Sequence, residues 1–199
     1  MPDDIDDDAT SRHSGLDPES LPEPTDEDDL NIEVANESGM HIPGFAESEL
    51  VTLARFVLDA LHVNPQSELS ILLVDTTVMS DLHQKWLDEP GPTDVLSFPM
   101  DELRPGHPGA QTGPGHLGDI VLCPEVAMAQ AKSAGHSTAE ELLLLTTHSI
   151  LHLLGFDHAD PEEEAEMFGL QRQLLLTYLA NRPSTGQAPA EKKPRRLKR

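Results

Sequence analysis

The chain has 199 residues, enough for one domain of ordinary size with tails, and its single cysteine, Cys123, excludes a disulfide framework and a cysteine-based zinc site. Its 36 Asp and Glu outnumber its 13 Lys and Arg, and the formal net charge of −23 repels nucleic acid at long range and favours basic protein partners. The chain begins with acidic residues instead of an export signal and has no apolar run that could span a bilayer, so we expect a soluble, cytoplasmic protein.

Acidic and basic residues are concentrated at opposite ends of the chain. Residues 1–33 contain thirteen Asp and Glu and one Arg in a run rich in Pro and Ser, whereas residues 182–199 contain seven Lys and Arg and one Glu. Neither segment offers an apolar face to bury. We expect a disordered acidic tail over residues 1–29, one folded domain over residues 30–181 and a disordered basic tail over residues 182–199. The folded part is itself acidic, with 22 acidic and five basic residues between 34 and 181.

The first half of the domain alternates strands and helices. Residues 30–37 alternate apolar and polar side chains, which indicates an edge strand with one solvated face. Apolar residues recur at helical spacing over 48–63, until Asn64 and Pro65 end the helix. The continuous apolar run in 68–74 predicts a strand covered on both faces, and Asp75 and Thr76 offer capping oxygens for a helix through about Leu87.

The second half adds two strands and then three helices. The clearest helix covers 138–154 and has almost no polar face, so it should lie in the middle of the domain. The remaining predicted elements are a strand at 93–98, a surface loop at 101–116, a strand at 120–123, a helix from Pro124 and a last helix from Pro161 to about Ala180. This order predicts an α+β fold, with a small mixed sheet packed with about five helices around a central helix.

One glycine-rich segment imitates a nucleotide-binding motif. Residues 113–118 spell GxGxxG, the fingerprint of dinucleotide-binding folds. That fingerprint must follow a strand and open a helix, whereas this segment precedes the strand-like residues 120–123. We therefore interpret it as chance clustering of glycine.

Three histidines near the predicted central helix have the spacing of metal ligands. His148 and His152 lie one helical turn apart, so their imidazoles can reach one ion. Gly155 supplies a left-handed helix end, after which His158 can return toward the same point. Three neutral imidazoles leave a tetrahedral Zn²⁺ with one open position for water, as in a catalytic site. The alternative is that the three histidines fell together by accident.

The same ligand spacing occurs in metzincin proteases, which carry Glu directly after the first histidine as general base. Here that position is Ser149, and a serine of ordinary pKa cannot take a proton from zinc-bound water. The pattern therefore resembles a metalloprotease in its ligands but lacks the base for peptide hydrolysis.

Two segments together resemble one family. The sequence HSILHLLGFDH, from His148 to His158, is similar to the HGxLHLxGYDH motif of the bacterial YbeY endoribonucleases, the rRNA maturation factors. Residues 92–99, PTDVLSFP, and residues 117–120, LGDI, resemble two strands of that family in the right order. The resemblance covers roughly residues 30–180 and leaves both tails outside.

The resemblance implies a metal-dependent endoribonuclease, a hydrolase of phosphodiester bonds specific for single-stranded RNA, that acts in late 16S rRNA 3′-end maturation and ribosome quality control. It implies that His148, His152 and His158 ligate one zinc ion. Many family members carry an Arg in the helix before the PTDVLSF strand, but Leu87 occupies that position here, so this cationic role is unassigned. Asp119, at a strand end, is a candidate to hold a ligand histidine or to act as a base, and a capping or surface carboxylate is its alternative role.

The acidic domain must be reconciled with an RNA substrate, because RNA binding usually needs several Lys or Arg contacts to phosphates. Either the basic tail supplies those contacts, or basic ribosomal proteins recruit the domain to rRNA on the small ribosomal subunit. Two other functions stay open at this point. They are a zinc peptidase-like hydrolase and a non-catalytic, metal-stabilised ribosome-binding factor.

Overall fold

The computed structural model describes residues 31–182, so both predicted tails lie almost entirely outside the described residues. Strands and helices follow one another in the predicted order, β-α-β-α-β-β-α-α-α. They are β1 Asn31–Asn36, α1 Ser48–Ala60, β2 Glu68–Leu73, α2 Thr76–Leu87, β3 Val95–Pro99, β4 His116–Leu122, α3 Pro124–Ala134, α4 Thr138–Leu153 and α5 Pro161–Asn181.

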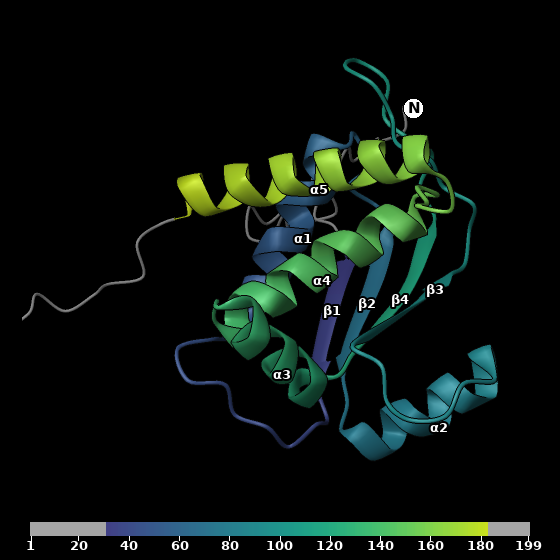
Figure 1. Ribbon diagram of the computed structural model, residues 1–199. Coiled ribbons are helices and arrows are strands. Elements are labelled where there is room, and N and C mark those ends of the chain that lie inside the picture. Colours follow the sequence, from purple (N-terminus) through teal and green to yellow (C-terminus); the bar gives the residue numbers. More distant parts are fainter. Residues whose placement is uncertain (1–30, 183–199) are drawn as a thin grey trace, which may run out of the picture.

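The four strands form one mixed sheet, as predicted (Figure 1). Their order is β1-β2-β4-β3, in which β1, β2 and β4 run parallel and β3 runs antiparallel to β4. The predicted edge strand β1 does lie at an edge, and its apolar residues Ile32 and Val34 are half-buried between exposed neighbours. Helices α1 and α2 connect successive strands, and the sheet contains both parallel and antiparallel pairs. This arrangement confirms the α+β fold.

Helix α4 is the central helix of the domain. It contacts α1, α3, α5, β3 and β4, and ten of its sixteen residues are buried. Figure 1 shows α4 crossing one face of the sheet, with α1 and α5 beside it. The main core lies between this helical layer and the inward-facing residues of the strands, such as Ile71 of β2 and Ile120 of β4. The prediction of a buried central helix is confirmed.

The opposite face of the sheet is only partly covered. Met79 of α2 packs there in a small buried cluster with Leu96 and Val121, whereas Ser70 and Leu72 of β2 are half-buried. These half-buried strand residues line a cavity of about 750 Å³. The prediction that β2 is covered on both faces was wrong, because α2 leaves Ser70 and Leu72 on this face only half-buried.

Strand β4 begins four residues earlier than predicted, at His116. Its first residues lack an apolar alternation because they include Gly118, which has φ +135°. A Cβ atom at Gly118 would lie 2.1 Å from the backbone oxygen of Phe98 on β3, so only glycine permits this close approach. The GxGxxG segment thus leads into a strand and no helix follows it directly, which confirms its rejection as a nucleotide fingerprint.

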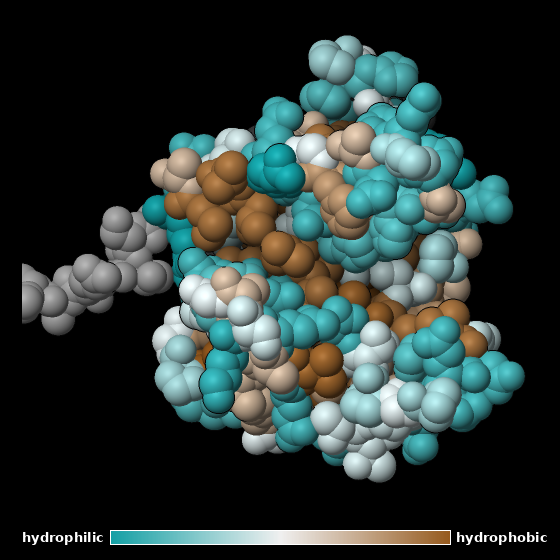
Figure 2. All heavy atoms as spheres, in the orientation of Figure 1, coloured by the Kyte–Doolittle hydropathy of each residue, from teal (hydrophilic) through white to brown (hydrophobic). Residues whose placement is uncertain are grey.

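Hydrophobic side chains gather in a band across the middle of the face drawn in Figure 2, between hydrophilic surfaces above and below. No helix in the part of the chain that the structure describes is long and apolar enough to cross a membrane.

Candidate metal centre

The N-terminus of α4 is fixed by a capping box. The Ser137 hydroxyl accepts a hydrogen bond from the backbone N–H of Glu140 (3.2 Å), and the Glu140 carboxylate accepts one from the backbone N–H of Ser137 (2.8 Å). These bonds satisfy two N–H groups that would otherwise have no partner in the first turn. The acidic first turn also complements the helix dipole. The helix that carries His148 and His152 therefore starts at a defined residue.

The C-terminus of α4 is equally well defined. Gly155 adopts the predicted left-handed conformation with φ +80°, and its N–H donates to His152 O (2.9 Å). The N–H of Phe156 donates to Leu151 O (3.0 Å). This pair of bonds is a Schellman motif, which ends a helix and turns the chain back. The turn brings His158 beside the last helical turn.

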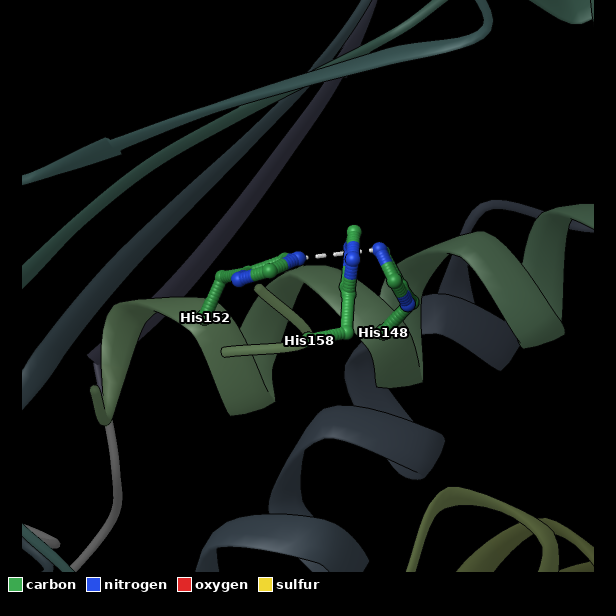
Figure 3. A group of neighbouring side chains, drawn as sticks. All are labelled: His148, His152 and His158. Atoms are coloured by element: carbon green, nitrogen blue, oxygen red, sulfur yellow. Dashed lines mark hydrogen bonds between the residues drawn. The ribbon is translucent and has the colours of Figure 1, made fainter. Parts of the chain in front are cut away.

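The three predicted ligands converge. One ring nitrogen of each of His148, His152 and His158 lies within 4.8 Å of the other two. The Nε2 atoms of His148 and His152 are 3.0 Å apart, and the centroid of the His158 ring lies 5.1 Å from that of His152. Figure 3 shows the nitrogens directed at a common point, with two rings rising from α4 and the third from the segment after it.

The second nitrogens of two rings are held by acceptors. Nδ1 of His148 lies 2.9 Å from Oε1 of Gln171, and Nδ1 of His152 lies 3.0 Å from the backbone oxygen of Phe156. Both partners only accept hydrogen bonds, so both Nδ1 atoms carry the proton. The Nε2 atoms of the neutral rings then present lone pairs to each other. Two lone pairs at 3.0 Å repel, unless a cation lies between them.

This donor set fits a zinc ion. Neutral imidazole is a favoured zinc ligand, and Zn–N bonds of about 2.0–2.1 Å separate two tetrahedral ligands by roughly 3.3 Å, close to the 3.0 Å between the Nε2 atoms of His148 and His152. Burial lowers the pKa of His148 below its ordinary value of 6.5, and the hydrogen bond to Gln171 only partly opposes this effect. Burial and the neighbouring His148 also lower the pKa of His152. Both rings are therefore neutral at pH 7 and ready to bind metal.

His148 and His152 line a cleft of about 990 Å³. The aromatic ring of Phe168, on α5, stacks on His148 (centroids 6.0 Å apart) and on His158 (5.6 Å), which fixes the planes of both imidazoles. Other lining residues come from β3, α4, the end of α2 and the β3–β4 segment. They include Trp86, Leu87, Asp94, Ser97, Arg104, Glu141 and Leu144.

The remaining predicted site residues lie elsewhere or play other parts. Ser149 is fully buried and its hydroxyl has no partner within residues 31–182, so it faces the core and not the histidines. Leu87 does line the cleft, and 57% of its side chain is exposed. Asp119 lines the cavity on the opposite face of the sheet, 3.9 Å from His116. The structure therefore does not bring Asp119 together with the three histidines.

Three residues of the site were not predicted. Gln171 and Phe168 lie on α5, and the sequence gives no reason to single out one Gln or Phe on a long helix. Arg104 lies in a segment without periodicity. The one feature of the sequence that could have indicated Arg104 is the scarcity of basic residues, because only five Lys and Arg lie between residues 34 and 181.

Comparisons with known proteins identify the family of this chain. The family model described as endoribonuclease YbeY matches residues 33–179. A protein of Beutenbergia cavernae named endoribonuclease YbeY is 69% identical over 153 residues, which are 77% of this chain and 100% of that protein. Proteins of the same name from Renibacterium salmoninarum (58% identity, 81% of this chain and 98% of that protein) and Thermobifida fusca (61%, 75% and 94%) are also similar. The chain belongs to the YbeY endoribonuclease family.

Proposed function

We propose that this protein is a zinc-dependent, single-strand-specific endoribonuclease of the cytoplasm that acts in late 16S rRNA 3′-end maturation and ribosome quality control. The observation that carries the proposal is the convergence of His148, His152 and His158 on one point, at an open cleft that His148 and His152 line. Three ligands leave a coordination position free, as catalytic sites require and structural sites do not. Family membership indicates RNA as the substrate class.

When bound by the three histidines, the ion supplies a positive charge that polarises a phosphodiester oxygen and lowers the pKa of water. The protein's own residues hold the ligands in place. Gln171 and the Phe156 carbonyl keep the protons on Nδ1 of His148 and His152, and Phe168 fixes the ring planes. Such partners usually determine metal affinity as much as the ligands themselves.

The cleft also offers surfaces for unpaired bases. Trp86 lines it and is 57% exposed; its ring packs edge-to-face with Phe98 (centroids 5.7 Å apart), and Nζ of Lys85 lies 5.1 Å from the centroid of the Trp86 ring. Exposed aromatic rings stack with unpaired bases, whereas bases within a duplex are covered by their neighbours. This supports a preference for single-stranded RNA.

The peptidase alternative is weaker. A zincin needs a carboxylate next to the first histidine, and here that position holds the buried Ser149, which cannot reach the cleft. The non-catalytic alternative, a metal-stabilised ribosome-binding factor, predicts that metal removal unfolds the chain and that no substrate is turned over.

The test is cleavage of three defined substrates by the purified full chain, namely a single-stranded RNA, the same RNA in a duplex, and casein. We expect cleavage of the single strand alone, loss of cleavage with a chelator and recovery with Zn²⁺. A 2′,3′-cyclic phosphate product would identify the RNA 2′-hydroxyl as nucleophile, and a 3′-hydroxyl with 5′-phosphate would identify water. Casein cleavage, or no turnover of any substrate with zinc bound, would overturn the proposal.

The partners that we propose are rRNA and the small ribosomal subunit, reached either through the basic residues 183–199 or through basic ribosomal proteins. Those residues lie outside the described part of the chain, so their contribution is measured by deletion. If they contact phosphates, deletion weakens RNA binding and reduces the slope of log affinity against log salt. Unchanged affinity and slope would leave recruitment by basic proteins as the route.

A further inference from the structure

Arg104 is held in a fixed place beside the metal centre. It lies in the segment between β3 and β4, which is pinned on both sides by backbone hydrogen bonds, from Asp101 N to His116 O (2.9 Å) and from Gly106 N to Leu61 O (2.9 Å). Its neighbour Leu103 packs against the main core. Although the Arg104 side chain is exposed, its backbone is therefore positioned by the fold.

The guanidinium group of Arg104 lies on the last turn of the ligand helix. Its Nη1 atom donates to the backbone oxygen of Leu154 (3.3 Å). It also occupies the space beside Gly155 that a side chain would fill, because a Cβ atom built there would lie 1.0 Å from Nη1 and 2.3 Å from Cζ. Gly155 thus has two roles: it ends the helix in the left-handed conformation, and its lack of a side chain leaves room for the guanidinium group. Gly155 is three residues from the candidate ligand His152.

Arg104 is the one Lys or Arg among the described residues that line the cleft. Within residues 31–182 it forms no ion pair, so its charge is not neutralised by a carboxylate. The acidic residues of the cleft already have partners. Asp94 accepts from Gln130 (2.9 Å), Glu141 is hydrogen-bonded to His136, and Asp157 accepts from the backbone N–H of His158 (2.7 Å).

We propose that Arg104 binds a phosphate group of the RNA strand in this cleft, next to the bond that is cut. The contact to Leu154 O uses one edge of the guanidinium, and its remaining N–H groups form the planar fork that fits two phosphate oxygens. In a domain whose overall charge repels RNA, this group supplies a local positive charge beside the metal centre. The inference deepens the proposed function and rests on it.

A purely structural role for Arg104 is the competing explanation. The C-terminus of a helix carries a partial negative charge, and an arginine that donates to its last carbonyl can simply stabilise it. That role affects the stability of the chain. A phosphate contact affects RNA affinity and its dependence on salt.

The variants Arg104→Gln and Arg104→Lys distinguish the two roles. RNA affinity and its salt dependence are measured for each as a zinc-loaded full chain. The probe is a single-stranded RNA with 2′-O-methyl groups, which gives binding without relying on cleavage. Loss of a charge-assisted phosphate contact should weaken binding of Arg104→Gln about tenfold and reduce the salt slope by about 0.7. Arg104→Lys, which keeps the charge but loses the fork, should lie between Arg104→Gln and wild type. Zinc affinity, from competition with a chelating dye, should not change.

The control is Arg172→Gln, which removes the same charge from the exposed side of α5, outside the lining of the cleft, and should keep wild-type affinity. Wild-type affinity and salt slope in Arg104→Gln would overturn the inference, whatever its melting temperature. If Arg104→Gln does not fold, the folded Arg104→Lys decides, and wild-type binding by it is the contrary result. Failure of the wild-type chain to bind the RNA would instead contradict the proposed function.

Discussion

Gln171 determines which nitrogen of His148 faces the metal position. Its amide oxygen accepts from Nδ1 at 2.9 Å, and only 9% of the Gln171 side chain is exposed. The bond therefore forms in a poorly solvated place, where water does not easily replace it. The backbone oxygen of Phe156 has the same role for His152, but a mutation cannot remove it.

Gln171→Leu should lower zinc affinity by about tenfold or more, because it removes the acceptor and leaves the Nδ1–H of the half-buried His148 imidazole without a partner. The measurement is a competition titration against a chromophoric chelator. Gln173→Leu, an exposed position on the same helix, is the matched control and should bind zinc normally. Equal affinities in both variants would show that Gln171 does not position His148.

At the residue scale the sequence predicted the convergence of the three histidines but not the residues that support them. His148, His152 and His158 lie within eleven residues, so helical geometry and one glycine suffice to bring them together. Gln171 is 23 residues from His148, and Arg104 is 50 residues from Leu154. Such contacts depend on how α5 and the β3–β4 segment pack, which no local pattern encodes.

Both the candidate metal site and the Arg104 guanidinium group lie at the end of α4, near Gly155. Gly155→Ala should destabilise the chain by about 1–2 kcal/mol for the left-handed backbone, and by more because the new Cβ displaces the guanidinium. Gly135→Ala is the matched control, because Gly135 has φ +85° and open space around its Cβ position. We expect only the backbone cost in this control.

Urea unfolding measures the loss of stability in Gly155→Ala and in Gly135→Ala, and titration with RNA measures whether the site still binds. Gly155→Ala should weaken RNA binding, whereas Gly135→Ala should not. Equal losses of stability in the two variants, with normal RNA binding in both, would show that the guanidinium does not occupy the position beside Gly155.

The start of α4 has a pH-dependent component. Hydrogen bonds from the backbone and the side chain of Ser137 hold the pKa of Glu140 below its ordinary value of 4.5. Because the pKa is lower in the folded chain, the stabilisation is present above the ordinary value and is lost as pH falls through the folded-state value. Glu140→Gln should therefore cost about 0.3–1 kcal/mol at pH 7.

The difference between wild type and Glu140→Gln should narrow below the ordinary carboxyl pKa, as urea unfolding is repeated from pH 7 down to about pH 3. Glu125→Gln, an exposed first-turn residue of α3, controls for the helix dipole without a capping box. A difference that stays constant across this range would show that the carboxylate bonds at Ser137 do not stabilise the folded chain.

At the element scale the order of strands and helices was predictable because each has its own periodicity and stop signal. Helix α2 begins after the capping Asp75 and ends at Leu87, as predicted. The start of β4 was missed because Gly118 interrupts the apolar pattern where two strands approach closely. The half-open face of β2 was missed because its apolar run does not show how much of the sheet α2 covers.

On the scale of the whole molecule, an acidic domain presents a candidate metal site whose cleft contains one arginine. Its charge keeps nucleic acid at a distance in general, and the centre can act only where local contacts overcome that repulsion. Under the proposed function, selectivity for a particular RNA depends on the residues of the cleft and on the proposed partners.

The proposed function and the proposed role of Arg104 both depend on one ion held by the three histidines. The most direct test is therefore metal analysis of the full chain beside two variants. Wild type should hold one zinc per chain after dialysis, and His152→Ala should lose both the zinc and RNA cleavage. His107→Ala, an exposed histidine outside the cluster, should keep both. A His152→Ala chain that retains one zinc, or a metal-free wild-type chain that cleaves RNA at the normal rate, would contradict the account.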